Sequence, residues 1–320
     1  MSYNTRDLLA RCVASLPAAA AGLALQTIVV DNGSRDGSLV AVRERFPDVV
    51  AIDSGGNLGF AKANNLGFER AVGRVRVWLN PDCEMSPGSL RALVSYLDEH
   101  PEVGAVGPRL DYEDGRSQPS AQRFPSALRV LVHFLGLARW APRLPVGIRR
   151  VLGRVMGGEA RGYLDALSPG DGPRAVDWVS GACIAVRAEV ARRVGPLDEG
   201  YFMYSEDTDW CQRVHQHGWD IHFVPTIAVV HQVGASAPSN PLVVEQYYRS
   251  LLRYFSRHRP GSFWAIRSLM CAGFVTRACG QALAKRLGGR SCQPWWRLAV
   301  ACWDGSGDRA QPGPISRGGG

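Results

Sequence analysis

Short apolar runs alternate with amphipathic stretches through the first 108 residues of this 320-residue chain, and this alternation restricts the fold more than any other feature. The pattern predicts strands at residues 27–30, 49–52, 75–79 and 103–106, and helices at residues 6–20, 36–46, 59–71 and 86–99, the first of them capped by Thr5. Such alternation implies a parallel α/β sheet. We therefore expect a doubly wound nucleotide-binding half that ends near Pro108.

The second half of the chain follows a different pattern. After Pro108 the alternation gives way to turn-rich sequence. Strands are then predicted at residues 177–179, 221–224 and 227–231, and helices from Ala188 and at residues 206–217. From Pro241 the pattern is again helical, up to a Gly/Pro-rich tail after Asp304 that lacks the apolar content to order itself.

The hydrophobic content of 46% is that of a folded protein with a large core, which excludes a disordered or fibrous chain. The eight cysteines show no C-x-x-C pair and no zinc-type spacing, so a reducing cytosol fits better than a disulfide framework. No charged segment followed by an apolar run opens the sequence, and no apolar stretch reaches the roughly 18 residues of a membrane span. We expect a cytoplasmic protein that is neither secreted nor membrane-spanning.

The net charge of +8 is concentrated in two segments. From Arg249 onward twelve Lys/Arg residues stand against Asp304 and Asp308, and residues 115–158 contain eight arginines among apolar side chains and no acidic residue. Basic amphipathic segments of this kind suit an anionic membrane surface. Nucleic acid is the other partner of basic proteins, but the sequence holds no recognised nucleic-acid motif. We expect a membrane surface as partner, and no nucleic acid.

Polar residues follow three of the predicted strands, at the edge of the sheet where ligands bind in open α/β folds. Asp31 begins a turn-rich run that could grip a base and ribose, although Asp31 and Asp36 could equally cap turns. Asp82, two residues after Asn80, could hold a hard cation against diphosphate oxygens. The alternative is a Pro-Asp turn whose acidic residues face the N-terminus of the next helix.

Three carboxylates, Glu206, Asp207 and Asp209, fall within four residues at the start of a predicted helix whose next turn carries Arg213. Crowded carboxylates repel one another unless a metal, an arginine or a substrate uses them. An acidic first turn paired with Arg213 is the simpler explanation, but it accounts for one or two carboxylates better than for three. His231 ends a predicted strand and could be an imidazole ligand or a packed structural residue.

Six motifs in this order resemble glycosyltransferase family 2, particularly its rhamnosyltransferase-like bacterial members. They are Asp31-Asn32-Gly33-Ser34, residues 57–65 from Asn57 to Asn65, Asn80-Pro81-Asp82, Gly181-Ala182, Glu206-Asp207-Thr208-Asp209 and His231-Gln232-Val233-Gly234. Their order and spacing match the family over about residues 2–236. Each motif alone is weakly specific, whereas six in order make coincidence a poor explanation.

The resemblance implies an α/β fold of the GT-A type, which is a Rossmann-like, mostly parallel nucleotide-binding sheet with helices on both faces, here with a C-terminal helical appendage. It implies that the nucleotide sugar is held by Tyr3, Asn4, Asp31, Asn57, Gly59, Lys62 and Asn80. It assigns Asp82 to Mg²⁺ or Mn²⁺ on the diphosphate, with His231 completing the metal site. Asp207 would be the catalytic base, with Glu206, Asp209, Arg213 and Gly181 in supporting or acceptor-side positions.

The same resemblance divides the chain. Residues 1–240 would form the catalytic domain, within which residues 115–175 are a basic, partly helical insertion on the acceptor side. Residues 241–303 would form a C-terminal basic amphipathic helical segment, and residues 304–320 a disordered tail.

The sequence departs from the family pattern in two places. Asn80 stands where many relatives carry the first Asp of a D-x-D motif, and a neutral amide is the weaker metal ligand. Relatives enter the Ser-Tyr-Asn motif from an apolar strand, whereas Met1 directly precedes Ser2 here. We therefore expect the first strand of the sheet to be missing. Either the true start lies upstream, which we favour, or the protein folds with the neighbouring strands unpaired.

The function expected from the resemblance is that of an inverting glycosyltransferase. The expected reaction moves L-rhamnose from dTDP-rhamnose to a hydroxyl of a lipid-linked or cell-surface polysaccharide precursor, on the inner face of the cell membrane. Two alternatives come from other classes. A catalytically inactive nucleotide-sugar or glycan-binding scaffold is one; a nucleotidyltransferase is the other, but it would require a Gly-rich triphosphate loop near the N-terminus that the sequence lacks.

Overall fold

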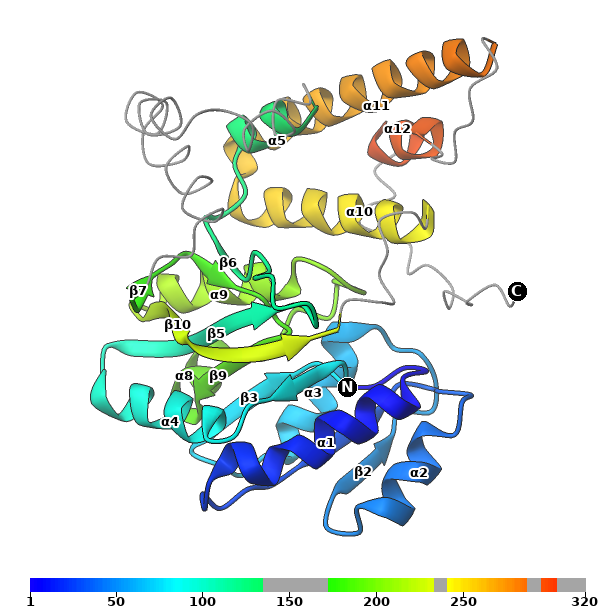
Figure 1. The fold of residues 1–320 in the computed structure, drawn as a ribbon. Helices are drawn as coiled ribbons and strands as arrows, with labels where there is room; N and C mark the ends of the chain where they lie inside the picture. The colour runs from blue at the N-terminus through cyan, green and yellow to red at the C-terminus, as the bar shows by residue number, and fades with distance from the viewer. Residues whose placement is uncertain (135–171, 233–240, 287–294, 304–320) are drawn as a thin grey trace. The chain divides into compact units, whose positions relative to one another are not determined.

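The computed structural model describes residues 1–134, 172–232, 241–286 and 295–303 (Figure 1). These residues belong to two compact units. The first unit contains residues 1–124, 172–199 and 206–232, and the second contains residues 125–134, 200–205 and the residues described after 240. Most of the predicted basic insertion and all of the predicted tail lie outside the described residues.

The first half of the chain alternates helix and strand as its sequence predicts (Figure 1). Its elements are α1 (Arg6–Ala20), β1 (Ile28–Asp31), α2 (Ser38–Arg45), β2 (Val50–Asp53), α3 (Phe60–Arg70), β3 (Val75–Leu79), β4 (Cys83–Met85), α4 (Ser89–Glu99) and β5 (Val103–Asp111). Strand β4 was not predicted, and β5 is longer than expected. Thr5 is the N-cap residue of α1 as predicted, but its side chain makes no capping hydrogen bond, because its hydroxyl pairs with the Ser2 hydroxyl at 2.9 Å.

The second half of the first unit adds short strands and two helices. These are β6 (Ala121–Gln122), β7 (Arg174–Ala175), β8 (Trp178–Val179), β9 (Cys183–Arg187), α8 (Ala188–Val194), α9 (Glu206–Gln216) and β10 (Asp220–His231). The two strands predicted at residues 221–231 form the single strand β10, whose register shifts between Val224 and Ala228. Strand β9 was not predicted.

The main sheet has the strand order β3-β9-β5-β10-β4, with β7 beside β10. Strands β5 and β10 are parallel, whereas β9 is antiparallel to both β3 and β5, and β4 is antiparallel to β10. The sheet is therefore mixed rather than purely parallel, because β9 enters between β3 and β5 in the opposite direction. Strands β1 and β2 form a separate parallel pair.

No described strand lies between β1 and β3, as expected from the missing first strand. Ser2 alone pairs there: its N–H donates to the Val30 carbonyl at 2.8 Å, and its carbonyl accepts the Asn32 N–H at 2.8 Å. A cavity of about 220 Å³ is lined by residues of both strands and of helix α1. Strands β1 and β3 thus keep one side without a strand partner.

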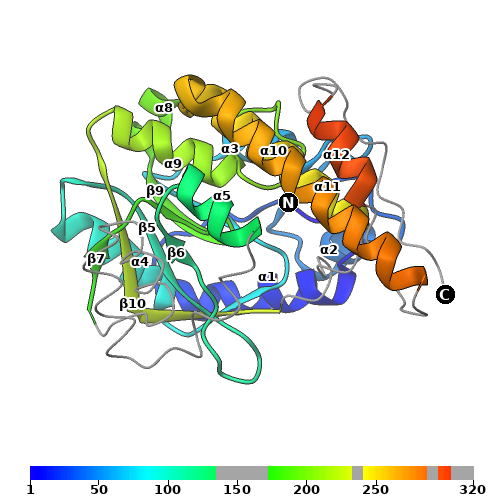
Figure 2. The same cartoon turned by 90° about the horizontal axis from the view of Figure 1, so that it is seen from above.

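Side chains alternate between the two faces of the main sheet, which gives three layers. In β9, Cys183 and Ala185 pack with helices α1 and α4, whereas Ile184 and Val186 pack with α3, α8 and α9. Figure 2 shows the two helix layers on opposite sides of the strands. The carboxyl end of β3 and the N-terminus of α9 both lie at the border of these three layers. The candidate site is formed by residues at these two ends.

The described part of the second unit contains the helices α5 (Ala127–Phe134), α10 (Pro241–His258), α11 (Phe263–Arg286) and α12 (Trp295–Trp303), with the short 3-10 helix η3 (Pro260–Ser262) between α10 and α11. Its core is aromatic, with Phe274 of α11 contacting Tyr248 of α10 at 4.7 Å and Trp295 of α12 at 6.2 Å between ring centroids. Helices α11 and α12 lie side by side (Figures 1 and 2). None of the helices in the described parts of the chain has the length and apolar content needed to cross a membrane.

Close packing in the first unit gives a stability prediction. A Cβ atom on Gly107 of β5 would approach the Cβ of Val179 to 2.6 Å. Because a Cβ atom moves only together with its backbone, we expect Gly107→Ala to lower the free energy of unfolding by about 1–3 kcal/mol in urea titrations. Gly56→Ala is the control, since no atom lies within 4 Å of the position that the added methyl group would take. Equal effects of the two substitutions would contradict the packing argument.

Candidate active site

The buried carboxylate at the end of β1 has an oxygen without a partner. Asp31 is 3% exposed, and its Oδ2 accepts the Ser34 N–H at 3.0 Å. Its Oδ1 is buried and accepts no hydrogen bond from any described residue. Asn4 holds the same loop, because its N–H donates to the Ser34 hydroxyl and its Oδ1 accepts the Arg35 N–H at 2.7 Å. The loop therefore presents an acceptor that a bound ligand with an N–H group would satisfy.

Asn32 connects this loop to the one that precedes α3. Its Nδ2 donates to the Asn57 Oδ1 at 3.1 Å and to the Gly59 carbonyl at 3.3 Å, and its Oδ1 accepts the Leu58 N–H at 2.8 Å. Gly59 has a φ of 85°, which few other residues adopt, and it directly precedes the N-terminus of α3. Lys62 is exposed on the first turn of that helix, and Tyr3 is half-buried. Asn32 thus orders the nucleotide loops predicted from the sequence.

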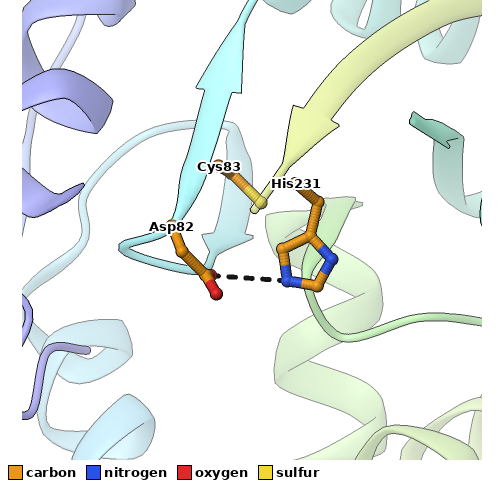
Figure 3. A group of neighbouring side chains, drawn as sticks. All are labelled: Asp82, Cys83 and His231. Atoms are coloured by element: carbon orange, nitrogen blue, oxygen red, sulfur yellow. Dashed lines mark ion pairs between the residues drawn. The ribbon is translucent and has the colours of Figure 1, made fainter. Parts of the chain in front are cut away.

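Asp82 and His231 come together because β10 pairs with β4. In that antiparallel register His231 lies opposite Cys83, the neighbour of Asp82. The His231 Nε2 is 3.4 Å from the Asp82 Oδ1 (Figure 3). These two residues are 149 positions apart in the sequence (231 − 82), so only the strand pairing brings them into contact.

Gln118 fixes the orientation of the His231 ring. Its Oε1 lies 2.8 Å from the His231 Nδ1, and its Nε2 donates to the His231 carbonyl at 2.6 Å. Because the amide oxygen can only accept, Nδ1 donates to it, and Nε2 faces Asp82. An imidazole oriented in this way can offer Nε2 to a metal ion.

Cys83 is the third residue of this cluster (Figure 3). One ligand atom each from Asp82, Cys83 and His231 lies within 4.8 Å of the others. The Cys83 thiol donates to the Ala182 carbonyl at 3.4 Å, and burial raises its pKa well above the ordinary value. A protonated thiol is a poor ligand for a hard cation, so the carboxylate and the imidazole are the ligand pair.

The backbone of Asp82 is held from the other side by Gln232. The Gln232 N–H donates to the Asp82 carbonyl at 2.8 Å, and its Nε2 donates to the Glu84 carboxylate at 3.0 Å. The same carboxylate accepts from the Arg11 Nε at 2.7 Å. This network joins α1, β4 and the end of β10, so that the Asp82 turn is fixed by three elements.

Asp207 lies in the first turn of α9 and accepts three hydrogen bonds. Its Oδ2 accepts the Gly181 N–H at 2.8 Å, and its Oδ1 accepts the Thr208 N–H at 2.7 Å and the Thr208 hydroxyl at 3.2 Å. The pKa of the Asp207 carboxyl is raised because its desolvation outweighs these hydrogen bonds. A carboxylate with a raised pKa is a better proton acceptor near neutral pH.

The turn at residues 180–182 contacts both the segment that contains Asp82 and the Asp207 carboxylate. Gly181 donates to Asp207, while the Ala182 carbonyl accepts the Asn80 N–H at 2.9 Å and the Cys83 thiol. A Cβ on Gly181 would lie 3.2 Å from the Asp207 carboxylate, so glycine lets the carboxylate approach the main chain closely. One turn thereby positions the Asp82 segment and the Asp207 carboxylate relative to each other.

Asp209 and Arg213 attach α9 to the segment after α8. The fully buried Asp209 carboxylate accepts from the Arg213 Nε at 2.9 Å. The same guanidinium donates to the carbonyls of Val194 and Pro196 at 2.7 and 2.8 Å. Removing one partner of such a buried pair costs about 3–5 kcal/mol, so these two residues hold the scaffold of α9 rather than reach a ligand.

Glu206 precedes Asp207 and is buried without a partner for its Oε2 among the described residues. Burial, and secondarily the neighbouring carboxylates of Asp207 and Asp209, raise its pKa well above the ordinary value. The side chain is therefore protonated at a pH where free glutamate is ionised. One carboxyl of the cluster is neutral, which relieves the crowding that the sequence indicated.

Gln118, Asn32 and Gln232 are the site residues that the sequence reasoning did not assign. Asn32 and Gln232 stand inside recognised motifs but carried no role of their own. Gln118 lies in the predicted basic insertion, 113 residues from His231, and no local pattern distinguishes it. Asn80 enters the site through its main-chain N–H, which bonds to Ala182.

Burial of Glu206 makes stability depend on pH. The folded state binds this proton more tightly than the unfolded state, because the pKa is raised above its ordinary value of 4.5. The free energy of unfolding is therefore expected to fall as the pH rises from 4.5 through the raised pKa. Glu206→Gln should flatten this slope in urea titrations at several pH values. The exposed Glu113→Gln is the control, and identical slopes for both variants and the parent would refute the assignment.

Comparison with known sequences gives two kinds of match. The family described as "Glycosyl transferase family 2" matches residues 1–153. The N-acetylglucosaminyl-diphospho-decaprenol L-rhamnosyltransferase of Mycobacterium tuberculosis is 32% identical over 278 residues, covering 82% of this chain and 84% of the relative. The rhamnosyltransferase WbbL of Escherichia coli K12 is 26% identical over 64% of this chain and 73% of its own.

Comparison with solved structures supports the fold. A mannosyltransferase from Pyrobaculum calidifontis, solved in complex with GDP-Man and Mn²⁺, is similar with a TM-score of 0.53. The match covers 95% of this chain and 78% of that one at 17% sequence identity, so it concerns the fold alone. The GT-A type of α/β fold expected from the sequence is confirmed.

Proposed function

The chain belongs to glycosyltransferase family 2, and on that premise we propose that it transfers L-rhamnose from dTDP-rhamnose to a hydroxyl of a lipid-linked or cell-surface polysaccharide precursor, with inversion. That it is a glycosyltransferase follows from the family; the donor, the acceptor and the stereochemistry are the proposal. Two relatives named as rhamnosyltransferases support the sugar, and the name of the mycobacterial one contains a lipid-diphosphate acceptor. The observation that carries the mechanism is the contact of one turn with both Asp207 and the Asp82 segment.

The unpartnered oxygen of Asp31 supports a particular class of nucleotide. A buried carboxylate oxygen needs a hydrogen-bond donor. Thymine and uracil offer the N3–H group and guanine the N1–H group, whereas adenine and cytosine have an acceptor at the corresponding ring nitrogen and donate only through their amino groups. Asp31 would therefore suit the ring N–H of thymidine, uridine or guanosine donors, with Asn4 and Asn32 holding its loop in place. The N-terminus of α3 after Gly59 suits the diphosphate.

Asp82 and His231 fit a divalent cation, because a carboxylate oxygen and an oriented imidazole nitrogen lie 3.4 Å apart. Oxygen ligands suit Mg²⁺, and the imidazole makes Mn²⁺ equally suitable. The bound cation would offset the negative charge that develops on the departing nucleotide diphosphate. In this proposal Asp82 and His231 hold the diphosphate through the cation, and Gln118 keeps the His231 ring in the binding tautomer.

Asp207 would act as the base in a single displacement. It removes the proton from the acceptor hydroxyl as that oxygen forms a bond to the anomeric carbon. The bond from this carbon to the diphosphate oxygen breaks on the opposite face, and its electron pair leaves with the nucleotide. The configuration is thereby inverted. Gly181 and Thr208 hold the Asp207 carboxylate in place through their N–H groups.

The reaction is proposed to take place at the inner face of the cell membrane, with the protein bound peripherally to an anionic surface. The support is the excess of basic over acidic residues after Arg249, together with a lipid-linked acceptor class. Lipid-linked acceptors of this class stay in the bilayer, so the enzyme must approach that surface.

The second candidate is an inactive protein that binds the nucleotide sugar or the glycan. The unpaired sides of β1 and β3 favour it, because β1 positions Asp31 and β3 leads to Asp82. Calorimetric binding of a donor without any turnover would support this candidate over the enzyme.

Transfer assays test the proposed roles. With dTDP-rhamnose, a divalent cation and a soluble lipid-diphosphate analogue, Asp207→Asn should lower kcat/KM by about 10²–10⁴-fold, the usual effect of losing a general base. Donor affinity measured by calorimetry should stay near that of the parent. Asp114→Asn, an exposed carboxylate on the surface, is the control. Equal rates for all three proteins would refute the base, and a panel of other nucleotide sugars would show whether rhamnose is the donor.

Titration with Mn²⁺, followed by electron paramagnetic resonance, tests the metal site without turnover. Gln118→Leu should weaken Mn²⁺ binding in the presence of dTDP by about 10–100-fold, because the ring of His231 loses its orientation. His231→Ala should weaken it at least as much. Gln122→Leu is the matched control, since the Gln122 side chain makes a long hydrogen bond of 3.5 Å to the nearby Pro119 carbonyl rather than to His231. Unchanged binding in Gln118→Leu would contradict the positioning role.

A further inference from the structure

Helix α11 exposes one side that is free of charge. From Trp264 to Leu283 every residue classed as exposed is neutral, and the largest of them are Trp264, Val275 and Leu283. The other side is buried, with Ile266, Met270 and Phe274 packed in the core of the second unit. The 20 residues from Trp264 to Leu283 span about 30 Å at 1.5 Å per residue. The outer side of this part of α11 is thus a long neutral surface, exposed among the described residues.

Helix α12 exposes a second apolar stripe. Trp296, Val300 and Trp303 follow at spacings of four and three residues, which places them on one side of the helix. Trp296 is 64% exposed and Trp303 is 80% exposed, while Leu298 and Cys302 on the other side are buried. Together with Trp264, which is 68% exposed, these are three tryptophans that face solvent on two adjacent helices.

Basic residues outnumber acidic ones beside these two surfaces. Residues 246–303 contain ten Lys/Arg residues and no Asp or Glu. Arg267 lies over the Trp264 ring at 5.0 Å, and its guanidinium donates to the carbonyls of Cys302 and Trp303. Arg297 of α12 is 50% exposed and lies 3.9 Å from the Glu245 carboxylate of α10. Arg267 therefore ties the end of α12 to α11 next to two of the exposed tryptophans.

We propose that the outer sides of α11 and α12 bind an anionic lipid surface, with Trp264, Trp296 and Trp303 at the boundary between head groups and acyl chains. The proposal rests on the proposed function and names the surface it would use. Tryptophan is enriched at that boundary, and amphipathic helices with basic residues lie in its plane. A second copy of the chain fits poorly, because the arginines that flank these surfaces would face those of the other copy. Nucleic acid fits poorly too, because the exposed side of α11 offers no cation to phosphate.

Vesicle sedimentation with the full chain tests the proposal. The parent protein should bind vesicles of phosphatidylcholine with phosphatidylglycerol and bind pure phosphatidylcholine much less. The triple variant Trp264→Ser, Trp296→Ser, Trp303→Ser should partition at least about tenfold more weakly, because the apolar contribution is lost. The control replaces three exposed apolar residues of the first unit, Leu25→Ser, Val40→Ser and Val72→Ser, and should bind like the parent. Quenching of tryptophan fluorescence by brominated lipids should decrease in the triple variant alone.

Sugar transfer to a soluble acceptor, measured on the same proteins, separates this proposal from the proposed function. The triple variant should keep the parental rate in solution. Vesicle binding without any transferase activity would refute the proposed function but would still support lipid binding by α11 and α12. The lipid surface is refuted if the parent ignores anionic vesicles, if the triple variant binds them like the parent, or if the three tryptophans instead drive self-association in sedimentation velocity.

Discussion

Two main-chain hydrogen bonds at residues 180–182 hold the candidate site together. The Gly181 N–H fixes the Asp207 carboxylate, and the Ala182 carbonyl accepts the Asn80 N–H, two residues before Asp82. The turn between strands β8 and β9 therefore contacts both acidic positions through its main chain. A Cβ atom at position 181 would lie 3.2 Å from the Asp207 carboxylate, so a residue larger than glycine would displace that carboxylate slightly. The remaining contacts orient groups whose positions this turn has already set.

The carboxylates of the site differ in charge state because they differ in partners. Asp209 is fully buried but paired with Arg213, and Asp207 accepts three hydrogen bonds that favour its charged form, although its desolvation raises its pKa. Glu206 has one oxygen without a partner and a raised pKa, so it keeps its proton. Such a division lets three acidic residues share one helical turn without the repulsion of three negative charges. It also leaves Asp207 as the carboxylate of this turn that is both ionisable and partly exposed.

The sequence predicted most of the first half of the fold, because burial on helices and strands leaves a periodic pattern there. Strand β4 escaped prediction since it has three residues, and β9 because its apolar run precedes a helix without a turn signal. The Thr5 side chain makes no capping hydrogen bond to α1 for another reason, which is that its hydroxyl pairs with the Ser2 hydroxyl. Asp82, His231 and Asp207 were identified through the resemblance, since each stands in a motif. Gln118 was not, because its role comes only from a contact across the fold.

The sequence by itself determined the order of the helices and strands, the family, the concentration of cations after Arg249 and the residues that could carry chemistry. These properties depend on local sequence or on composition, so they can be read without the fold. The tertiary structure decided which residues come into contact. The pairing of β10 with β4 places His231 beside Asp82. The two strands predicted from the sequence form the single strand β10, which continues across a register shift. Packing also decided which side of α11 is covered, because Ile266 and Trp264 are both large hydrophobic residues in the sequence, and only the neighbouring helices bury the first and leave the second exposed.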